Sequence, residues 1–167
     1  MSSTSSGSRT NVRWMIRRDL PECLKIESES FPSPWSESDF LLVLRQPNAV
    51  GVVVENGTQV LGFAIYELCD GYTHLLDIAV APEHRRKGYG SQLISWITAR
   101  IRPPKRLSLE LEVRETNLVA QHFFRSVGLK ATSVERGFFV DTHEDGYVFK
   151  WKAPIVVNDE MVSGSLS

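Results

Sequence analysis

The chain has few cysteines, no long apolar segment and almost no net charge. Cys23 and Cys69 fit neither a metal-ligand spacing nor a disulfide framework, so we expect both to be reduced, buried thiols. No apolar run approaches the roughly 18 residues that a membrane helix requires. The 19 basic and 20 acidic side chains give a net charge of −1, whereas general nucleic-acid binders usually carry a basic excess. These absences disfavour disulfide scaffolds, membrane proteins and nucleic-acid binders, and they predict a cytoplasmic protein.

What is present is the composition of one folded domain. The 167 residues are 42% hydrophobic and 23% charged, which is typical of a globular chain of this size. Residues 1–10 contain five serines, so we predict a disordered tail there. Pro154 and Gly164 lie within a loosely ordered C-terminal tail that we predict at 153–167. The folded domain is therefore predicted at 11–152.

Apolar periodicity predicts a mixed α+β fold with the order β-α-α-β-β-β-α-β-α-β-β. The expected strands are 14–17, 49–54, 60–68, 73–80, 107–113, 130–139 and 147–151, and the expected helices are 19–31, 36–44, 88–101 and 117–127. Asn56-Gly57 is a strong hairpin signal between two strands. Because that hairpin lies in the middle of the chain, a regular doubly wound sheet is disfavoured. The continuous apolar run at 73–80 favours burial on both faces.

Residues suited to helix ends support these boundaries. Asp19 with Glu22, and Ser36 with Asp39, have the spacing of a capping box at a helix start. Gly128 follows the last apolar stripe, where a glycine commonly ends a helix in the left-handed conformation.

The most specific motif is His84-Arg85-Arg86-Lys87-Gly88-Tyr89-Gly90-Ser91, between a buried strand and a helix. Unpaired amides and the helix dipole at such a helix start favour anions, and glycine permits close backbone approach. The segment is neither a P-loop nor G-x-G-x-x-G, because Leu93 stands at the third glycine position. Segment 82–106 carries seven basic residues against Glu83 alone, a local charge of +6. We interpret the remaining R-x-x-G-x-G pattern as a polyphosphate site, the alternative being a tight turn with a solvated basic run.

This pattern after the strand LLDIAV resembles the GNAT superfamily of N-acetyltransferases. Segment 111–117, LEVRETN, resembles a block of bacterial ribosomal-protein-alanine N-acetyltransferases, as do FPSPWS at 31–36 and IAVAP at 78–82. The resemblance extends from about residue 14 to 152. It implies a central mixed sheet of about seven strands flanked by four helices.

The resemblance also implies acetyl-CoA as the acetyl donor and no metal. Carried over residue by residue, Ile78, Ala79 and Val80 would pair with the pantetheine arm, and Asn117 would contact the cofactor near its sulfur. The pyrophosphate would be held by Arg85, Arg86, Lys87, Gly88, Tyr89, Gly90 and Ser91.

Glu112 is implied to be the general base. A carboxylate close to an α-amine, whose pKa is about 8, can accept the proton released during attack. Glu110 lies two residues away on the same strand face and is the second candidate, while an exposed structural glutamate is the alternative reading. His74, at the start of the strand 73–80, could titrate near the site, although a structural or surface role is favoured. The four histidines form no metal-ligand pattern.

Two positions depart from the family pattern. The tyrosine that protonates the leaving thiolate is replaced by Phe124, and a tyrosine pair is replaced by Phe138-Phe139. Water or another group can protonate a thiolate of ordinary pKa, and this is the explanation that we favour. The alternatives are a tyrosine reaching the sulfur from elsewhere, or a relative with another acceptor or weak activity. The candidate tyrosines are Tyr72, Tyr89 and Tyr147.

The acceptor is predicted to be cationic. Segment 19–39 holds six acids and only Lys25, a charge of −5 that would attract an amine or a basic peptide end. The resemblance implies the N-terminal α-amine of a protein such as a ribosomal protein. Phe31 and Trp35 either line the acceptor groove or pack in the core. The alternatives are a small amine or lysine as acceptor, a non-catalytic acetyl-CoA-binding regulatory domain, and a ribosome-binding protein without cofactor.

Overall fold

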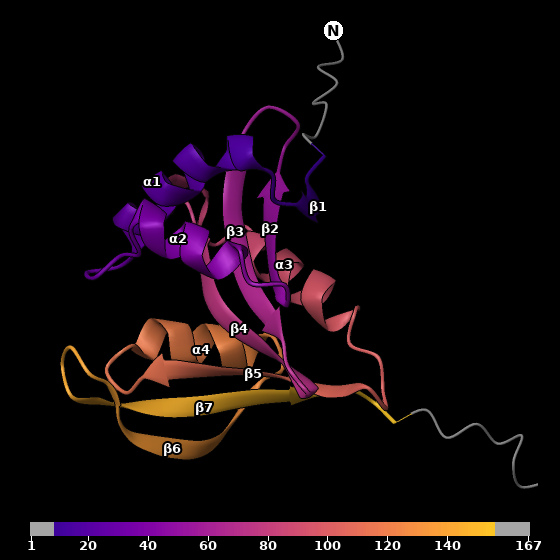
Figure 1. Cartoon of the computed structure of the whole chain (residues 1–167), viewed down its shortest axis with the longest axis vertical. Helices are drawn as coiled ribbons and strands as arrows, with labels where there is room; N and C mark the ends of the chain where they lie inside the picture. Colours follow the sequence, from indigo (N-terminus) through magenta and orange to yellow (C-terminus); the bar gives the residue numbers. More distant parts are fainter. Residues whose placement is uncertain (1–8, 156–167) are drawn as a thin grey trace, which may run out of the picture.

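The computed structural model describes residues 9–155 as one seven-stranded sheet with helices on both faces (Figure 1). The strands are β1 (Asn11–Trp14), β2 (Ala49–Glu55), β3 (Val60–Leu68), β4 (Gly71–Val80), β5 (Arg106–Arg114), β6 (Lys130–Phe139) and β7 (Glu144–Lys152). The α-helices are α1 (Leu20–Ser30), α2 (Glu37–Leu44), α3 (Tyr89–Thr98) and α4 (Leu118–Ser126). None of these helices is long and apolar enough to cross a membrane.

The sheet consists of two antiparallel halves joined by one short parallel contact. The strand order is β1-β2-β3-β4-β5-β7-β6, and only β4 and β5 run parallel. Their pairing extends from Gly71 opposite Arg106 to His74 opposite Glu110 and then ends. Figure 1 shows the consequence: β2–β4 run steeply while β5–β7 run across them. Beyond His74, β4 therefore continues to Val80 with no strand on its β5 side.

A bulge in β4 lies where the strands separate. In the β3–β4 ladder, Ile65 is opposite Asp77 and Tyr66 is opposite Leu75, so Leu76 is the extra residue. A bulge bends its strand and increases the local twist. It therefore turns the second half of β4 away from β5 and creates the fork on which the candidate site is built.

Two apolar cores lie on the opposite faces of the sheet. α1 and α2 bury Cys23, Ile26 and Phe40 against β2–β4. On the other face, α3 and α4 pack against the sheet through a second buried cluster that includes Leu93 and Phe124. Each helix thus presents one apolar stripe to the sheet, as its sequence period predicts.

The predicted fold class and element order are confirmed, with local corrections. The first strand is at 11–14 rather than 14–17, because the chain turns into a short 3₁₀ helix at Arg17–Asp19. The strand 73–80 contributes to both cores, through Leu75 on one face and Ala79 on the other, although its residues alternate between buried and half-buried. Cys23 is fully buried as expected, whereas Cys69 is only half-buried. Most of the two predicted tails lies outside the described residues.

The two predicted capping boxes have different outcomes. Ser36 accepts a hydrogen bond from the Asp39 amide at 3.2 Å, and the Asp39 carboxylate accepts from the Ser36 amide at 2.8 Å, which confirms the box. Asp19 does not cap α1: its carboxylate points back to the Arg13 guanidinium at 2.7 and 2.9 Å and to the Ile16 amide at the start of the 3₁₀ helix. Arg13 also holds the pKa of Asp19 below its usual value. A buried charge with an available guanidinium favours that ion pair over the helix amides.

The capping box at Ser36 is the basis of our first prediction. We expect Ser36→Ala to lower the free energy of unfolding by about 1 kcal/mol, because it removes the acceptor for an orphan amide of α2. The exposed Ser38, in the first turn of the same helix, supplies the matched control, and Ser38→Ala should leave stability nearly unchanged. Urea denaturation of both variants measures the difference. Equal stability of the two variants would contradict this role for the cap.

Candidate active site

The glycine-rich segment forms the connection from β4 to α3. A 3₁₀ turn at Pro82–His84 follows the strand, and Gly88 is the N-cap of α3. Arg86 and Gly88 have positive φ values of 61° and 86°. No side chain caps the amides of the first turn of α3. Alternating backbone conformations of this kind direct successive N–H groups into one concavity that suits a phosphate.

Two residues of this segment, Arg85 and Gly90, make structural contacts with other elements. The Arg85 guanidinium donates to the Val80 carbonyl and to the Ser30 hydroxyl, both at 2.9 Å, so it ties the end of β4 to α1. A Cβ atom at Gly90 would lie 3.0 Å from the ring of Phe123, so this glycine permits α3 to approach α4. Arg86, Lys87 and Gly88 remain exposed at the start of α3.

The unpaired edge of β4 offers backbone groups. Ala81 donates its N–H to the Leu61 carbonyl on the β3 side at 2.8 Å. Because backbone groups alternate along an antiparallel strand, Ile78 and Val80 direct theirs to the opposite edge, toward the fork. The groups of Ala79 face β3 by the same alternation. Of the three residues predicted to pair with pantetheine, two therefore direct their amides away from β3.

A histidine joins two carboxylates where the fork begins. His74 Nε2 lies 2.7 Å from Glu112 Oε2, and Nδ1 lies 3.0 Å from Glu67 Oε1. The hydrogen bond that His74 donates to Glu112 is the largest cause that raises the pKa of His74 to about 9, despite the opposing effect of burial. The imidazole is therefore protonated at neutral pH, and Glu112 is held as its carboxylate partner.

The sequence favoured a structural or surface role for His74, whereas the structure pairs it with Glu112. Glu110, the second candidate base, is engaged in an ion pair. The available signal was the position of His74 at the start of a strand parallel to β5, but the pairing register that brings it to Glu112 is not a local pattern. Glu110 makes an ion pair with Lys150 of the neighbouring β7 strand at 2.6 Å. Glu110 is therefore held by a lysine, whereas the partner of Glu112 is a histidine, a side chain that can lose its proton as the pH rises. Glu112 stays the predicted base.

Most of the remaining predicted residues lie toward the C-terminal end of β5, whereas Tyr72 lies beside its start. Asn117 caps α4, its side-chain oxygen accepting from the Ala120 amide at 3.1 Å. Phe124 is 5% exposed and packs against Phe123 and Phe149, with ring centroids 5.1 and 6.2 Å apart. Tyr147 pairs with Val113 and lies on the α4 face of the sheet, partly buried against the same core. Tyr72 is engaged by Cys69, whose hydrogen bond raises the tyrosine pKa.

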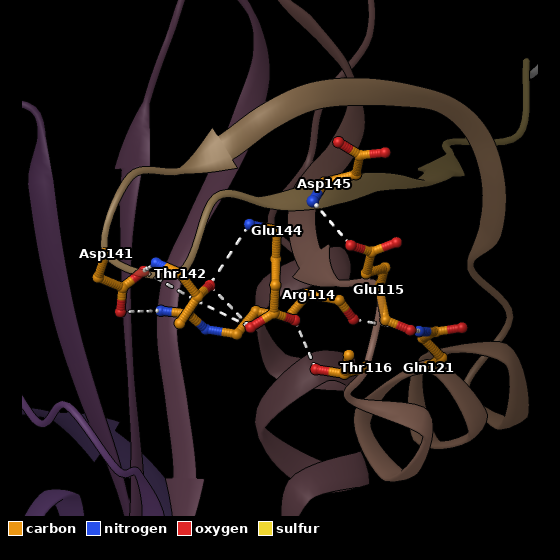
Figure 2. Close-up of polar contacts among 8 residues, drawn as sticks. All are labelled: Arg114, Glu115, Thr116, Gln121, Asp141, Thr142, Glu144 and Asp145. Carbon is orange, nitrogen blue, oxygen red and sulfur yellow. Dashed lines mark hydrogen bonds and ion pairs between the residues drawn. The ribbon is translucent and has the colours of Figure 1, made fainter.

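Arg114, two residues after Glu112, fixes the β6–β7 turn beside the site (Figure 2). Its guanidinium makes a bidentate ion pair with Asp141, both contacts being 2.9 Å, and donates to the Thr142 hydroxyl at 3.0 Å. It also lies 4.1 Å over the ring of Phe139. Four contacts from one side chain hold the turn against the end of β5, although Asp141 itself is exposed.

The acidic segment 19–39 is less available than its charge suggests. Asp19 is paired with Arg13, Glu27 is 2% exposed and Asp39 belongs to the capping box. Half of the six acids are therefore structural. Phe31 and Trp35 are half-buried against the α1–α2 core, which is closer to core packing than to an open groove. Within residues 9–155, no group of three His, Cys, Asp or Glu side chains could hold a metal ion.

Sequence comparisons place this arrangement among known proteins. The model of the acetyltransferase (GNAT) family matches residues 20–129. The chain is 28% identical over 132 residues to the [ribosomal protein bS18]-alanine N-acetyltransferase of Escherichia coli K12, covering 78% of this chain and 88% of that protein. It is 25% identical to an N-alpha-acetyltransferase of Sulfurisphaera tokodaii, with 85% and 92% covered.

Solved structures share the fold. The ribosomal-protein-S18-alanine N-acetyltransferase from Escherichia coli superposes with a TM-score of 0.78 at 23% identity, covering 90% of this chain and 98% of the other. Arabidopsis thaliana NAA60 in complex with acetyl-CoA superposes with a TM-score of 0.75 at 17% identity, covering 87% and 100%. The forked sheet, the R-x-x-G-x-G helix start and the family match agree, and the chain belongs to the GNAT acetyltransferase family as an N-acetyltransferase.

Proposed function

We propose that this enzyme transfers an acetyl group from acetyl-CoA to the N-terminal α-amine of a protein, by direct attack in a ternary complex. The observation that carries the proposal is the fork between β4 and β5, with the His74–Glu112 pair at its base and the glycine-rich helix start at its open end. The fork supplies outward-facing strand amides, an anion site and a titratable pair within one region of the fold.

The residues present suit acetyl-CoA. The outward amides of Ile78 and Val80 can pair with an extended amide-bearing arm as an additional strand would. The first-turn amides of α3, from Gly88 to Ser91, suit a pyrophosphate, and the exposed Arg86 and Lys87 add positive charge. Arg85 contributes indirectly, because it holds Val80 and Ser30 together. Acetyl-CoA supplies the thioester carbonyl that the amine attacks.

The outward amides of β4 also suit the charge that develops during attack. An N–H of Ile78 or Val80 can donate to the carbonyl oxygen, and such preorganised donors contribute strongly to acyl-transfer catalysis. Phe124 cannot protonate the leaving thiolate, and its buried ring is packed in the core. Water or another group performs that step at modest cost, since a thiolate of ordinary pKa leaves readily.

Glu112 and His74 act together as the base. In the resting pair, the imidazolium holds the carboxylate in place and also weakens it as a base. When His74 loses its proton, the pair can accept one from the acceptor ammonium. The carboxylate of Glu112 takes that proton directly or through a water, and His74 fixes its orientation. Glu67 holds the second ring nitrogen, so the imidazole cannot rotate away.

The names of the relatives support a protein N-terminus as the acceptor. One is a ribosomal-protein alanine acetyltransferase and another is an N-alpha-acetyltransferase. The acids of segment 19–39 that are not used structurally, Glu22, Glu29 and Glu37, leave negative charge near α1 and α2 that suits an ammonium group.

The acceptor class is tested with two peptides of one sequence. The first has a free N-terminal alanine and an internal lysine, and the second has its α-amine blocked. We expect a mass increase of one acetyl group on the first peptide, mapped to its N-terminus, and none on the second. Modification of the lysine in both peptides would overturn the N-terminal assignment in favour of a lysine or small-amine acetyltransferase.

The base is tested by a matched pair of substitutions on one strand face. We expect Glu112→Gln to lower kcat by about 10²–10⁴, which is the usual contribution of general-base catalysis. Glu110→Gln, two residues away, should retain activity near the wild-type level. Calorimetry should give the same acetyl-CoA affinity for both variants. A full loss of turnover in Glu110→Gln but not in Glu112→Gln would reverse the assignment.

The pH profile tests the coupling of Glu112 to His74. Because the pKa of His74 is about 9, we expect kcat/KM to keep rising from pH 7 to about 9. In His74→Gln, the rise should level off near the pKa of the acceptor amine, about 8. Initial rates with saturating acetyl-CoA measure both profiles. Superimposable profiles would exclude His74 from the base.

A further inference from the structure

Two carboxyl side chains meet inside the domain without a cation. Glu27 of α1 and Asp77 of β4 are 2% and 8% exposed, and the two carboxyl groups interact directly. Glu27 Oε2 and Asp77 Oδ2 are both fully buried and have no donor among the described residues. Two ionised carboxylates in such surroundings repel each other strongly, whereas one shared proton supplies the missing donor.

Among the described residues, one backbone amide is the sole group that favours the ionised form of Asp77. Burial is the largest cause that raises its pKa to about 9, followed by the contact with Glu27. The facing residue on β3 is Ile65, which is apolar. Cys23 of α1 is the other titratable group that interacts with Asp77, and burial raises the pKa of that thiol as well. The Ile78 amide alone favours the ionised form.

The pair connects the two halves of the candidate active site. Glu27 Oε1 accepts a hydrogen bond from the Trp35 amide at 2.9 Å, so Glu27 fastens the segment between α1 and α2. Asp77 precedes Ile78, whose outward amide belongs to the unpaired edge of β4 and also hydrogen-bonds the Asp77 carboxyl. One side of the pair thus holds the acceptor side, and the other holds the strand proposed to bind the acetyl donor.

We propose that Glu27 and Asp77 share one proton and that this acid–carboxylate pair positions the 31–36 segment against β4 for acceptor binding. Loss of the shared proton leaves two adjacent buried carboxylates. Their repulsion then separates α1 from β4 and releases the Trp35 amide. The pair is a positioning element and does not touch the reacting atoms. Its kinetic consequence rests on the proposed function, whereas its proton content does not.

Stability measures the shared proton independently of activity. The folded chain keeps a proton that an unfolded aspartate, with a pKa near 3.9, has already lost, so unfolding releases it. Between about pH 5 and 6, where His74 is protonated in both states, the unfolding equilibrium constant of the wild type should rise up to about tenfold per pH unit relative to Asp77→Asn. In that variant the asparagine amide donates permanently to Glu27.

A second variant and a control complete this measurement. Glu27→Gln keeps an acceptor for the Trp35 amide and donates to the Asp77 carboxylate, so it should show the same flattened dependence. Asp70→Asn changes an exposed aspartate in a bend and should behave as the wild type. The infrared band of a protonated carboxylic acid at pH 7 should be present in the wild type and in Asp70→Asn, and absent from both pair variants.

Positioning is tested with the N-terminal alanine peptide. In the wild type, KM for the peptide should rise at least several-fold as pH passes 9, and amide hydrogen exchange of 31–36 should increase relative to Asp77→Asn. In Asp77→Asn, KM should stay flat, while the rise of kcat/KM from His74 remains. Equal proton release and equal infrared spectra in wild type and both pair variants would overturn the proposal. If no N-terminal peptide were acetylated, the proposed function would fail, and proton release and exchange would still decide the pair.

Discussion

The interruption of parallel pairing between β4 and β5 is the constraint on which the site depends. Up to His74 and Glu110, the strands share a ladder, and this contact fixes the distance at which His74 reaches Glu112. Beyond it, the bulge at Leu76 turns β4 away and leaves the outward backbone groups of Ile78 and Val80 without a neighbouring strand. An unpaired strand edge inside a domain is costly unless something satisfies it. Here the same irregularity creates the titratable pair and the edge that can receive an extended ligand.

Side chains that surround the fork hold it open from different elements. Arg85 ties the end of β4 to α1, the Glu27–Asp77 pair ties α1 to the middle of β4, and Arg114 fastens the β6–β7 turn to the end of β5. These contacts are polar, and several are exposed or half-buried, unlike the apolar cores on the two sheet faces. The apolar cores determine which fold forms, and these hydrogen bonds and ion pairs determine where its loops lie.

Much of the fold followed from local patterns, because apolar periodicity, the Asn56-Gly57 hairpin and Gly128 each act within a few residues. The helix start at Gly88 could also be predicted from local residues. The contacts that join distant segments could not be predicted in this way. Asp19 has the spacing of a cap, yet it binds Arg13. Glu27 and Asp77 are fifty positions apart in sequence (77 − 27), and each resembles an ordinary surface acid until α1 packs on β4. The register that joins His74 to Glu112 is likewise a property of the assembled sheet.

The packing of Gly90 against Phe123 limits what the R-x-x-G-x-G pattern can reveal about ligand binding. A Cβ atom at this position would crowd the ring of Phe123 in α4 and require it to shift, so the second glycine favours close helix packing whether or not a phosphate ever binds. Gly88 has open surroundings, and its constraint is the positive φ with which α3 begins, a conformation that side chains rarely adopt. Both glycines of the pattern therefore serve the fold itself, so the pattern alone does not record whether a phosphate is bound.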